Sequence, residues 1–332
     1  MPEFRKDPVI DRWVIIATQR AKRPQRGAGQ NETAGTEPCP FCAGNEAMTP
    51  PPVLTYKADS PDFHVAAWSL RVVPNRYPAL VDEGTWTEQP YSIYKTMKGL
   101  GVHEVIIEAP EHVVNMGTLD EKRLEQVFHA YRDRIIQLQK DQRWRSILIY
   151  KNHGAEAGAT LDHIHSQLIA LPTVPKAIEE EVDGAKKYHD AHGSCIYCAM
   201  IDQEIGDQNR IVAESDRFIV FCPYASRFPY ETWILPKQHA PCFELALKDD
   251  YADLARSLRG LLIRLNRRFE DPPFNYFIHT NSWDEAANAY YHWHMELLPK
   301  LSQAAGFEWG SGAYINSVAP EEAARHLRDV RF

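Results

Sequence analysis

The sequence lacks any apolar run long enough to cross a membrane. A membrane-spanning helix needs roughly 20 predominantly apolar residues, and the apolar stretches here are much shorter. The first seven residues, Met-Pro-Glu-Phe-Arg-Lys-Asp, also lack the apolar core of a secretory signal peptide. We therefore expect a cytoplasmic protein with no membrane partner.

Positive charge is scarce as well. The chain has 37 Lys and Arg residues against 45 Asp and Glu residues, which gives a formal net charge of -8 at pH 7. Proteins that bind the nucleic-acid backbone usually carry a basic face, so we expect no nucleic-acid partner. A local basic pocket for a small anion remains compatible with this charge.

Cysteine is limited to six residues in 332. Without an export signal, disulfide bonds are not expected, and metal binding or thiol chemistry is the better interpretation. Four of the six form two Cys-x-x-Cys pairs, Cys39/Cys42 and Cys195/Cys198. The other two, Cys222 and Cys242, lie beside apolar residues and are predicted to be ordinary buried thiols.

What the chain does contain is enough apolar material for a sizeable core. The composition is 44% hydrophobic and 25% charged, as in a globular protein. A length of 332 residues allows two ordinary domains, or one large fold built from two similar halves.

The most informative short motif is His163-Ile164-His165-Ser166-Gln167, which an apolar run follows. In a strand, successive side chains alternate between faces, so His163, His165 and Gln167 should project from the same face. Such a row can bind a metal, supply a nucleophile or an acid-base group, or have a structural role. The motif alone leaves these alternatives open.

An internal repeat organises the rest of the chain. Each half contains, in order, a Cys-x-x-Cys pair, a strand followed by Pro and His, an amphipathic helix, a strand and a His-x-His strand. In the first half Thr118 and Glu121 have the spacing of a capping box, which predicts the start of the helix there. The repeat predicts two homologous α+β halves, residues 1–175 and 190–332, joined near residues 173–190 by a charged, partly helical connector.

The repeat also groups the cysteines with histidines. Two thiolates and two imidazoles suit a closed, structural zinc site, and each half offers one such set, so two zinc ions per chain are expected. A redox role for the pairs is the rival interpretation, and it is less favoured because neither pair is predicted to open a helix. The predicted ligands are Cys39, Cys42, His112 and His163 in the first half, and Cys195, Cys198, His239 and His292 in the second.

With the His163-x-His165-x-Gln167 motif after a glycine-containing loop, and with the duplication, the sequence resembles the galactose-1-phosphate uridylyltransferase family of the histidine-triad superfamily. The resemblance covers almost the whole chain, from residues 5–9 and 20–24 to residues 306–308. The loop at 151–159 and the His-Ser-Gln ending are closer to the ADP-glucose phosphorylase-like branch. Ile164 stands where the best-known uridylyltransferases have proline, which leaves the nucleotide base and the acceptor open.

The resemblance implies histidine-triad-like halves with antiparallel sheets and packed helices, and it gives His165 the role of nucleophile. A neutral imidazole attacks the α-phosphorus of a nucleoside diphosphate sugar, and a second phosphate then takes the nucleotide from the histidine in a ping-pong exchange. Gln167 would stabilise charge on the phosphate oxygens, and His163 would hold the strand through zinc. His294 has the nucleophile's place in the second half, but Glu296 replaces the glutamine there.

The resemblance also implies substrate contacts and a homodimer. The nucleotide would meet Arg71, Asn75 and the loop with Asn152, Gly158 and Thr160. The sugar phosphate would meet Arg20, Arg23, Phe307, Glu308, Gly310, Ser311 and Gly312. His279 and His294 could also join His292 in a metal site.

Several functions remain open at this stage. The leading hypothesis is uridylyl exchange between UDP-glucose and galactose 1-phosphate, and adenylyl transfer from ADP-glucose to phosphate competes closely with it. Further alternatives are a nucleotide hydrolase of the histidine-triad kind, a zinc-stabilised nucleotide-binding protein without turnover, and a metallohydrolase that uses the His-x-His pair as ligands.

Overall fold

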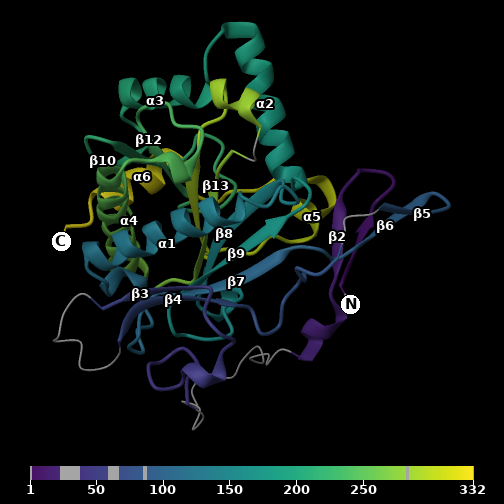
Figure 1. Ribbon diagram of the computed structural model, residues 1–332. Helices are drawn as coiled ribbons and strands as arrows, with labels where there is room; N and C mark the ends of the chain where they lie inside the picture. Colours follow the sequence, from purple (N-terminus) through teal and green to yellow (C-terminus); the bar gives the residue numbers. More distant parts are fainter. Residues whose placement is uncertain (1, 23–37, 59–66, 85–87, 282–283, 332) are drawn as a thin grey trace.

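The structure is a computed structural model that describes residues 2–22, 38–58, 67–84, 88–281 and 284–331 (Figure 1). It contains a ten-stranded sheet and a four-stranded sheet, and the strand pairs within both sheets are antiparallel. The strand order of the large sheet is β10 (Ile211–Glu214), β11 (Phe218–Phe221), β12 (Thr232–Pro236), β14 (His294–Pro299), β13 (Phe274–His279), β8 (Ser146–His153), β9 (His165–Leu171), β7 (Val102–Ile107), β4 (Trp68–Pro74) and β3 (Leu54–Lys57).

The large sheet uses one arrangement twice. Counted from the outer edge of the sheet to its centre, each half places its first, second, third, fifth and fourth strand along the chain. The two central strands, β8 and β13, are therefore equivalent. These two strands pair antiparallel, with Tyr150 opposite Phe277. An approximate two-fold axis therefore passes between them, and both halves share one continuous sheet. The predicted α+β fold with two similar halves is confirmed, while the boundaries 1–175 and 190–332 stay predictions.

Two long helices, α1 (Glu121–Leu138) and α4 (Lys248–Phe269), pack against each other over one face of this sheet. Helix α1 begins after Asp120, whose carboxylate accepts a hydrogen bond from the Arg123 N–H at 2.9 Å. The predicted capping box is therefore wrong, because Thr118 ends a preceding 3-10 helix (Met116–Thr118).

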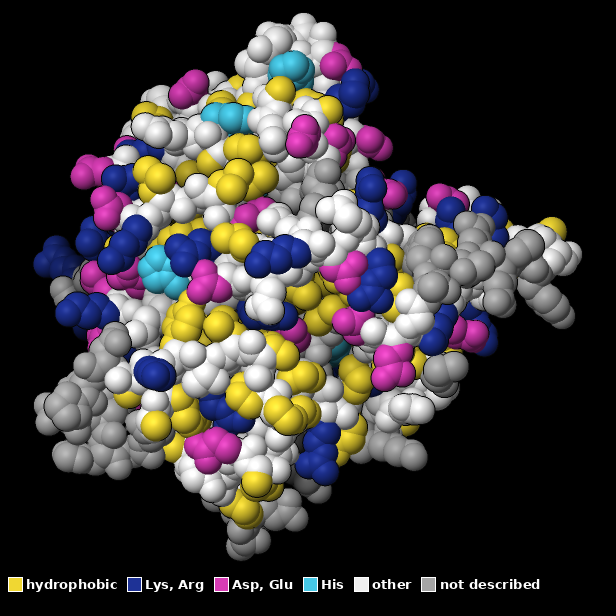
Figure 2. Space-filling model, in the orientation of Figure 1, with side chains coloured by type: hydrophobic (Ala, Val, Ile, Leu, Met, Phe, Trp, Pro, Cys, Tyr) yellow, Lys and Arg dark blue, Asp and Glu magenta, His cyan; other side chains and the backbone are white. Residues whose placement is uncertain are grey.

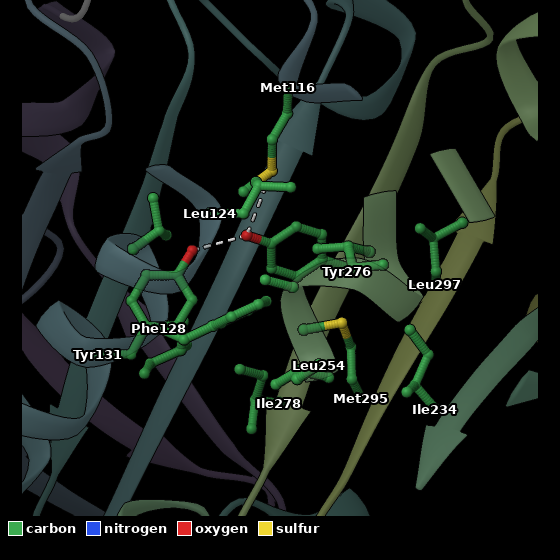
Figure 3. Close-up of a cluster of buried hydrophobic side chains, with 14 of the residues drawn as sticks. Met116, Leu124, Phe128, Tyr131, Ile234, Leu254, Tyr276, Ile278, Met295 and Leu297 are labelled. Atoms are coloured by element: carbon green, nitrogen blue, oxygen red, sulfur yellow. Dashed lines mark hydrogen bonds between the residues drawn. The ribbon is translucent and has the colours of Figure 1, made fainter. Parts of the chain in front are cut away.

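The main core fills the space between these helices and the sheet (Figure 3). Leucine and aromatic side chains from α1 and α4 meet the apolar residues of β12, β13 and β14 there. Two buried hydroxyls, those of Tyr131 and Tyr276, hydrogen-bond to each other at 2.6 Å and so join a helix of the first half to a strand of the second. Burial of this apolar surface is the main stabilising contribution to the fold.

The opposite face of the sheet carries the polar residues of the central strands. Residues directly opposite one another in adjacent strands project to the same face. A row crosses the sheet in this way, with Gln167 beside Tyr150, Tyr150 beside Phe277, and Phe277 beside Glu296. The alternation predicted for β9 thus places His165 and Gln167 away from the helices, while Leu168 and Ala170 enter the core.

The small sheet has the strand order β2 (Trp13–Ile16), β1 (Glu3–Lys6), β6 (Tyr94–Lys98) and β5 (Glu88–Tyr91). Its Phe4 and Met97 pack with Leu80 and with Leu171 at the end of β9. The remaining helices are α2 (Lys176–His192), α3 (Ile196–Asp207), α5 (Gly306–Ser311) and α6 (Pro320–Arg328). The charged connector expected near residues 173–190 is largely helix α2.

Within the described part of the chain, no helix is long and apolar enough to cross a membrane. Lys and Arg side chains are intermixed with Asp and Glu side chains over the face seen in Figure 2. The negative net charge is therefore not gathered into one block on that face.

Leu254 on α4 is fully buried in the main core, whereas Leu245 is 69% exposed. We expect Leu254→Ala to lower the free energy of unfolding by about 2–5 kcal/mol, because it removes buried methyl groups and leaves a cavity. The matched change Leu245→Ala should cost less than about 0.5 kcal/mol. Urea unfolding followed by circular dichroism measures both, and equal losses would contradict the assignment of the core.

Candidate active site

Strand β9 positions the central motif. It begins at His165, so His163 lies just before the strand. The alternation in the sequence had predicted instead that His163 lies within this strand, on the same face as His165 and Gln167. His165 and Gln167 are consecutive residues on one face, with Ile107 and Val105 of β7 opposite them. Both side chains are largely buried, with His165 7% and Gln167 3% exposed.

The His165 ring is held in one tautomer. Its Nδ1 lies 2.8 Å from the carbonyl oxygen of His163, and a carbonyl can only accept, so Nδ1 carries the proton. The lone pair of the neutral ring is then on Nε2. The ring of Phe41 packs edge-on against His165, with the centroids 5.2 Å apart, and restricts its rotation. This arrangement suits a nucleophile that attacks through Nε2.

A buried ionic network supports the backbone of His165. The Lys151 ammonium donates to the carbonyl oxygen of His165 at 3.0 Å and to Glu108 at 2.5 Å. Ser166 donates to the same carboxylate at 2.7 Å. Because Lys151 and Glu108 are almost fully buried, each charge needs the other. The network links β8, β9 and the residue that follows β7 beneath His165.

Gln167 has three neighbours around its side-chain oxygen. Oε1 lies 2.9 Å from His103 Nε2, 3.1 Å from the Tyr150 hydroxyl and 3.4 Å from Asn75 Nδ2. Asn75 was predicted from the resemblance as a nucleotide contact, whereas His103 and Tyr150 were not predicted. The pairing register of the strands could have identified them. Both residues lie on strands adjacent to β9, and their side chains project to the same face of the sheet as Gln167.

The predicted phosphate loop follows β8. Gly154 and Gly158 have φ values of 78° and 89°, which side chains rarely adopt. The Asn152 side-chain oxygen accepts from Asn275 Nδ2 at 2.8 Å, so its amide N–H₂ points away from that contact. Thr160 is half-buried at the end of the loop. The loop lies near His165, because it follows β8, whose Tyr150 lies opposite Gln167 of β9.

The predicted arginines fall in different places. Arg20 Nη1 is 3.3 Å from the Tyr77 carbonyl oxygen and 3.4 Å from His103 Nδ1, at the Gln167 end of the site. Arg71 is buried on β4, where Nη2 donates to Thr49 at 2.8 Å. It shares the face of His165 across β7, since Ile107 lies opposite both residues. Arg23 lies outside the described residues.

The segment predicted to bind the sugar phosphate forms the short helix α5, which Gly312 ends. Phe307 and Trp309 are 56% and 78% exposed. The polar side chains Glu308 and Ser311 bond to backbone groups of their own segment. Within one chain, these contacts do not join Phe307, Glu308, Gly310, Ser311 and Gly312 to His165.

The first predicted ligand set converges on one point. Its four ligand atoms, from Cys39, Cys42, His112 and His163, lie within 4.8 Å of one another. Tetrahedral zinc with its usual bond lengths places nitrogen and sulfur about 3.6 Å apart, and the observed Sγ to Nδ1 distances are 3.4 to 3.6 Å. His163 Nε2 donates to the Ala109 carbonyl at 2.8 Å, which turns the Nδ1 lone pair toward the thiols. The residues therefore fit zinc.

Burial lowers the pKa of His163 to about 4, so its ring is neutral and ligand-competent at pH 7. The second set, Cys195, Cys198, His239 and His292, repeats the geometry. Cys198 Sγ lies 3.4 Å from His239 Nδ1 and 3.7 Å from His292 Nδ1. Both rings donate through Nε2 to backbone carbonyls, as His163 does.

One expectation about the cysteines is wrong. Cys195 is the N-cap of α3, so the second Cys-x-x-Cys pair does open a helix. The hydrogen bond from Cys198, together with that from His292, lowers the pKa of the Cys195 thiol to about 3. The thiolate favoured in this way suits metal binding as well as redox chemistry, and the two facing imidazoles favour the metal.

A third cluster includes His294, the counterpart of His165 in the second half. Its members, Glu181, His279, His294 and Glu296, bring four ligand atoms within 4.8 Å and could hold a divalent cation. His279 and His294 therefore group with two carboxylates. The sequence had suggested instead that they could join His292 in a metal site. Hydrogen bonding and charge from His279 outweigh burial and lower the pKa of Glu181 to about 2. Arg227 also bonds to Glu296.

His294 differs from His165 in its access to solvent. Its Nδ1 lies 3.0 Å from the His292 carbonyl oxygen, which repeats the tautomer of His165. However, the rings of Tyr197 and Trp233 stack on it at 5.1 Å, and its side chain is fully buried. Its Nε2 is buried, with carboxylate oxygens of Glu296 and Glu181 at 3.6 and 3.9 Å, so a substrate phosphate would meet two negative groups there.

Comparisons with known proteins agree with this geometry. The family descriptions "Galactose-1-phosphate uridyl transferase, N-terminal domain" and "C-terminal domain" match residues 1–175 and 181–328. The ADP-glucose phosphorylase of Arabidopsis thaliana is 37% identical over 99% of this chain and 93% of its own. A galactose-1-phosphate uridylyltransferase of Thermotoga maritima is 29% identical over 99% of both chains. The crystal structure of the Arabidopsis enzyme with bound ADP-glucose superimposes with a TM-score of 0.78, at 35% identity and full coverage of both chains. The chain belongs to the galactose-1-phosphate uridyl transferase family, whose named relatives here are nucleotidyltransferases.

Proposed function

We propose that this protein transfers a nucleoside monophosphate from a nucleoside diphosphate hexose to a second phosphate through a covalent nucleotidyl-His165. The observation that carries the proposal is the tautomer of His165, which places the lone pair on Nε2 at the polar face of the sheet. A neutral imidazole in this state can attack phosphorus without losing a proton first.

The reaction has two matching steps. In the first, Nε2 forms a bond to the α-phosphorus, and the bond from that phosphorus to the bridging oxygen breaks, so hexose 1-phosphate leaves. Positive charge develops on the ring, and the His163 carbonyl oxygen that accepts from Nδ1 stabilises it. In the second step an oxygen of the acceptor phosphate attacks the same phosphorus and the P–N bond breaks. Nε2 then recovers its lone pair.

The surrounding groups stabilise charge on the phosphates. The amide N–H₂ of Gln167 can donate to a nonbridging oxygen next to the attacked phosphorus. The Asn152 amide and the backbone of the glycine loop reach the phosphates from β8. Arg20 and Arg71, with Asn75, are proposed substrate contacts, and Arg23, Thr160 and residues 307–312 stay predictions.

The donor and acceptor have two candidates. Uridylyl exchange between UDP-glucose and galactose 1-phosphate fits the family. Adenylyl transfer from ADP-glucose to inorganic phosphate is supported by the higher identity to the Arabidopsis ADP-glucose phosphorylase, 37% against 29% for the Thermotoga uridylyltransferase. Both reactions use the same histidine chemistry, and hydrolysis would differ only in having water as acceptor.

Each Cys/His set is proposed to hold one zinc ion. Such an ion supplies structural cross-linking when bound. In the first half, His163 would join this cross-link through its side chain while its carbonyl holds His165. The set in the second half would tie α3 to the residues that precede β14 in the same way.

The protein is further proposed to be a homodimer in the cytoplasm. The cytoplasmic location remains a prediction from sequence. Five largely exposed apolar side chains would be available to such an interface, namely Val9, Ile93, Phe307, Trp309 and Ile315, which are 56% to 86% exposed. Such side chains commonly mark interaction surfaces when they gather in patches.

The covalent step is tested with nucleotide sugars labelled in the α-phosphate. UDP-glucose or ADP-glucose should leave acid-labile, base-stable label on the chain, and galactose 1-phosphate or phosphate should release it. His165→Asn should reduce labelling roughly 10⁴-fold or more, because the nucleophile is lost. His129→Asn is the control and should label normally, because His129 lies on α1 against Tyr251 of α4, at the face of the sheet opposite His165.

The acceptor that releases the label identifies the reaction. Release by galactose 1-phosphate indicates a uridylyltransferase, release by phosphate a phosphorylase, and rapid release by water a hydrolase. Absence of label from both donors, or normal labelling of His165→Asn, would show that the proposed function is wrong.

The metal sites predict a zinc content close to two per chain by elemental analysis. Cys39→Ser and Cys195→Ser should each reduce the content by about one ion, because three remaining ligands bind zinc more weakly. Loss of the first ion should also reduce labelling of His165, since a displacement of about 1 Å can cost roughly a hundredfold in rate. A zinc-free preparation with full activity and unchanged melting temperature would refute the structural role.

A further inference from the structure

The side-chain amide of Gln167 can face the site in two ways. With its N–H₂ toward the polar face it donates to a phosphate oxygen, and with its oxygen there it repels that charge. The hydrogen-bond partners of the amide determine which orientation is adopted. One group near Gln167 has a fixed hydrogen-bonding role, because a backbone N–H can only donate. It is the N–H of Ala79.

The Ala79 N–H bonds to His103 on β7, which in turn contacts Gln167. The His103 side chain is buried, at 4% exposed. The Ala79 backbone nitrogen lies 3.0 Å from His103 Nδ1, and Arg20 Nη1 lies 3.4 Å from the same atom. Both groups can only donate, so Nδ1 must be unprotonated. The ring therefore carries its proton on Nε2.

The proton on Nε2 determines the orientation of Gln167. His103 Nε2 is 2.9 Å from the Gln167 side-chain atom assigned as Oε1, and a donor there requires that atom to be oxygen. Asn75 agrees, because its own oxygen accepts from the Tyr77 N–H at 2.9 Å and leaves Nδ2 to donate toward Gln167. The donors of His103 and Asn75 lie 3.1 Å apart because they converge on the same oxygen.

The second half supplies an independent comparison. Val105 lies opposite Gln167, and Trp233 lies opposite Glu296. Two residues before Val105 is His103 on β7, and two residues before Trp233 is Glu231, which directly precedes β12, so these two residues are equivalent. Glu231 is a carboxylate that accepts from Arg227 and Trp233, and Arg227 also bonds to Glu296. Both positions differ together between the halves, so the pairing of a neutral donor with an amide occurs only in the half that carries His165.

We propose that His103 is a positioning residue for nucleotidyl transfer, which locks the Gln167 amide with its N–H₂ toward the reacting phosphate. The consequence for rate rests on the proposed function, whereas the orientation itself does not. The lock runs from the Ala79 backbone through the His103 ring to Gln167, so it needs no movement during the reaction. Tyr150 adds a hydroxyl to the same oxygen but can rotate, and so cannot set the orientation alone.

The orientation is tested on the wild-type protein by NMR with ¹⁵N-labelled histidine. We expect His103, assigned by its loss in His103→Gln, to carry its proton on Nε2 and a lone pair on Nδ1. The reverse tautomer would overturn the proposal. This readout needs no turnover, so it remains decisive if labelling from UDP-glucose and ADP-glucose fails and the proposed function falls.

The effect on rate is tested by single-turnover labelling of His165. His103→Phe should slow labelling roughly tenfold to a hundredfold, which is no more than the loss expected on removing the Gln167 amide itself. The nucleotide-sugar concentration that gives half-saturation should change little. His103→Gln should restore most of the rate, because its side-chain nitrogen is as many bonds from the backbone as Nε2 of histidine. If His103→Phe does not fold, the labelling rate of His103→Gln still tests the proposal.

A double-mutant cycle separates positioning from general packing. In a Gln167→Ala background, His103→Phe should slow labelling by less than about twofold, because there is no amide left to orient. An equal loss in both backgrounds would overturn the proposal. A loss confined to half-saturation, or a glutamine variant as slow as the phenylalanine variant, would overturn it too.

Discussion

The hydrogen bond from His165 Nδ1 to the carbonyl oxygen of His163 is the interaction on which the site depends. It selects the tautomer that leaves the lone pair on Nε2, and it ties the proposed nucleophile to a residue whose own ring belongs to a set that could hold a metal ion. His163 is fixed in turn through its bond to the Ala109 carbonyl. One residue thus links the proposed zinc cross-link to the chemistry two residues later.

The two-fold repeat shows how the same scaffold can carry different sites. Both halves keep the tautomer-setting contact, since His294 bonds to the His292 carbonyl as His165 does to that of His163. The surroundings differ, because Tyr197 and Trp233 stack on His294, whereas the ring of Phe41 packs edge-on against His165. Chemistry at one site therefore requires more than the His-x-His motif. We propose that it also requires a neutral partner such as Gln167, at the position where the second half has Glu296.

Sequence reasoning predicted what depends on local patterns and on the repeat. The α+β halves, the two long helices and both Cys/His sets follow from periodicity, spacing and matching order, and the structure brings each ligand set together. Assignments that depend on details of strand ends and pairing were missed. The helix start at Asp120 and the helical position of Cys195 are decided by a few backbone angles. The roles of His103, Tyr150 and Glu181 depend on which strands and helices become neighbours, which spacing along the chain does not encode.

The central claim is that His165 attacks through Nε2, and the position of the covalent bond tests it most directly. The labelled protein can be digested and the nucleotidyl-histidine identified by mass spectrometry and ³¹P NMR against the two ring isomers. The account predicts the label on Nε2 of His165. A label on Nδ1, or on another residue, would contradict it.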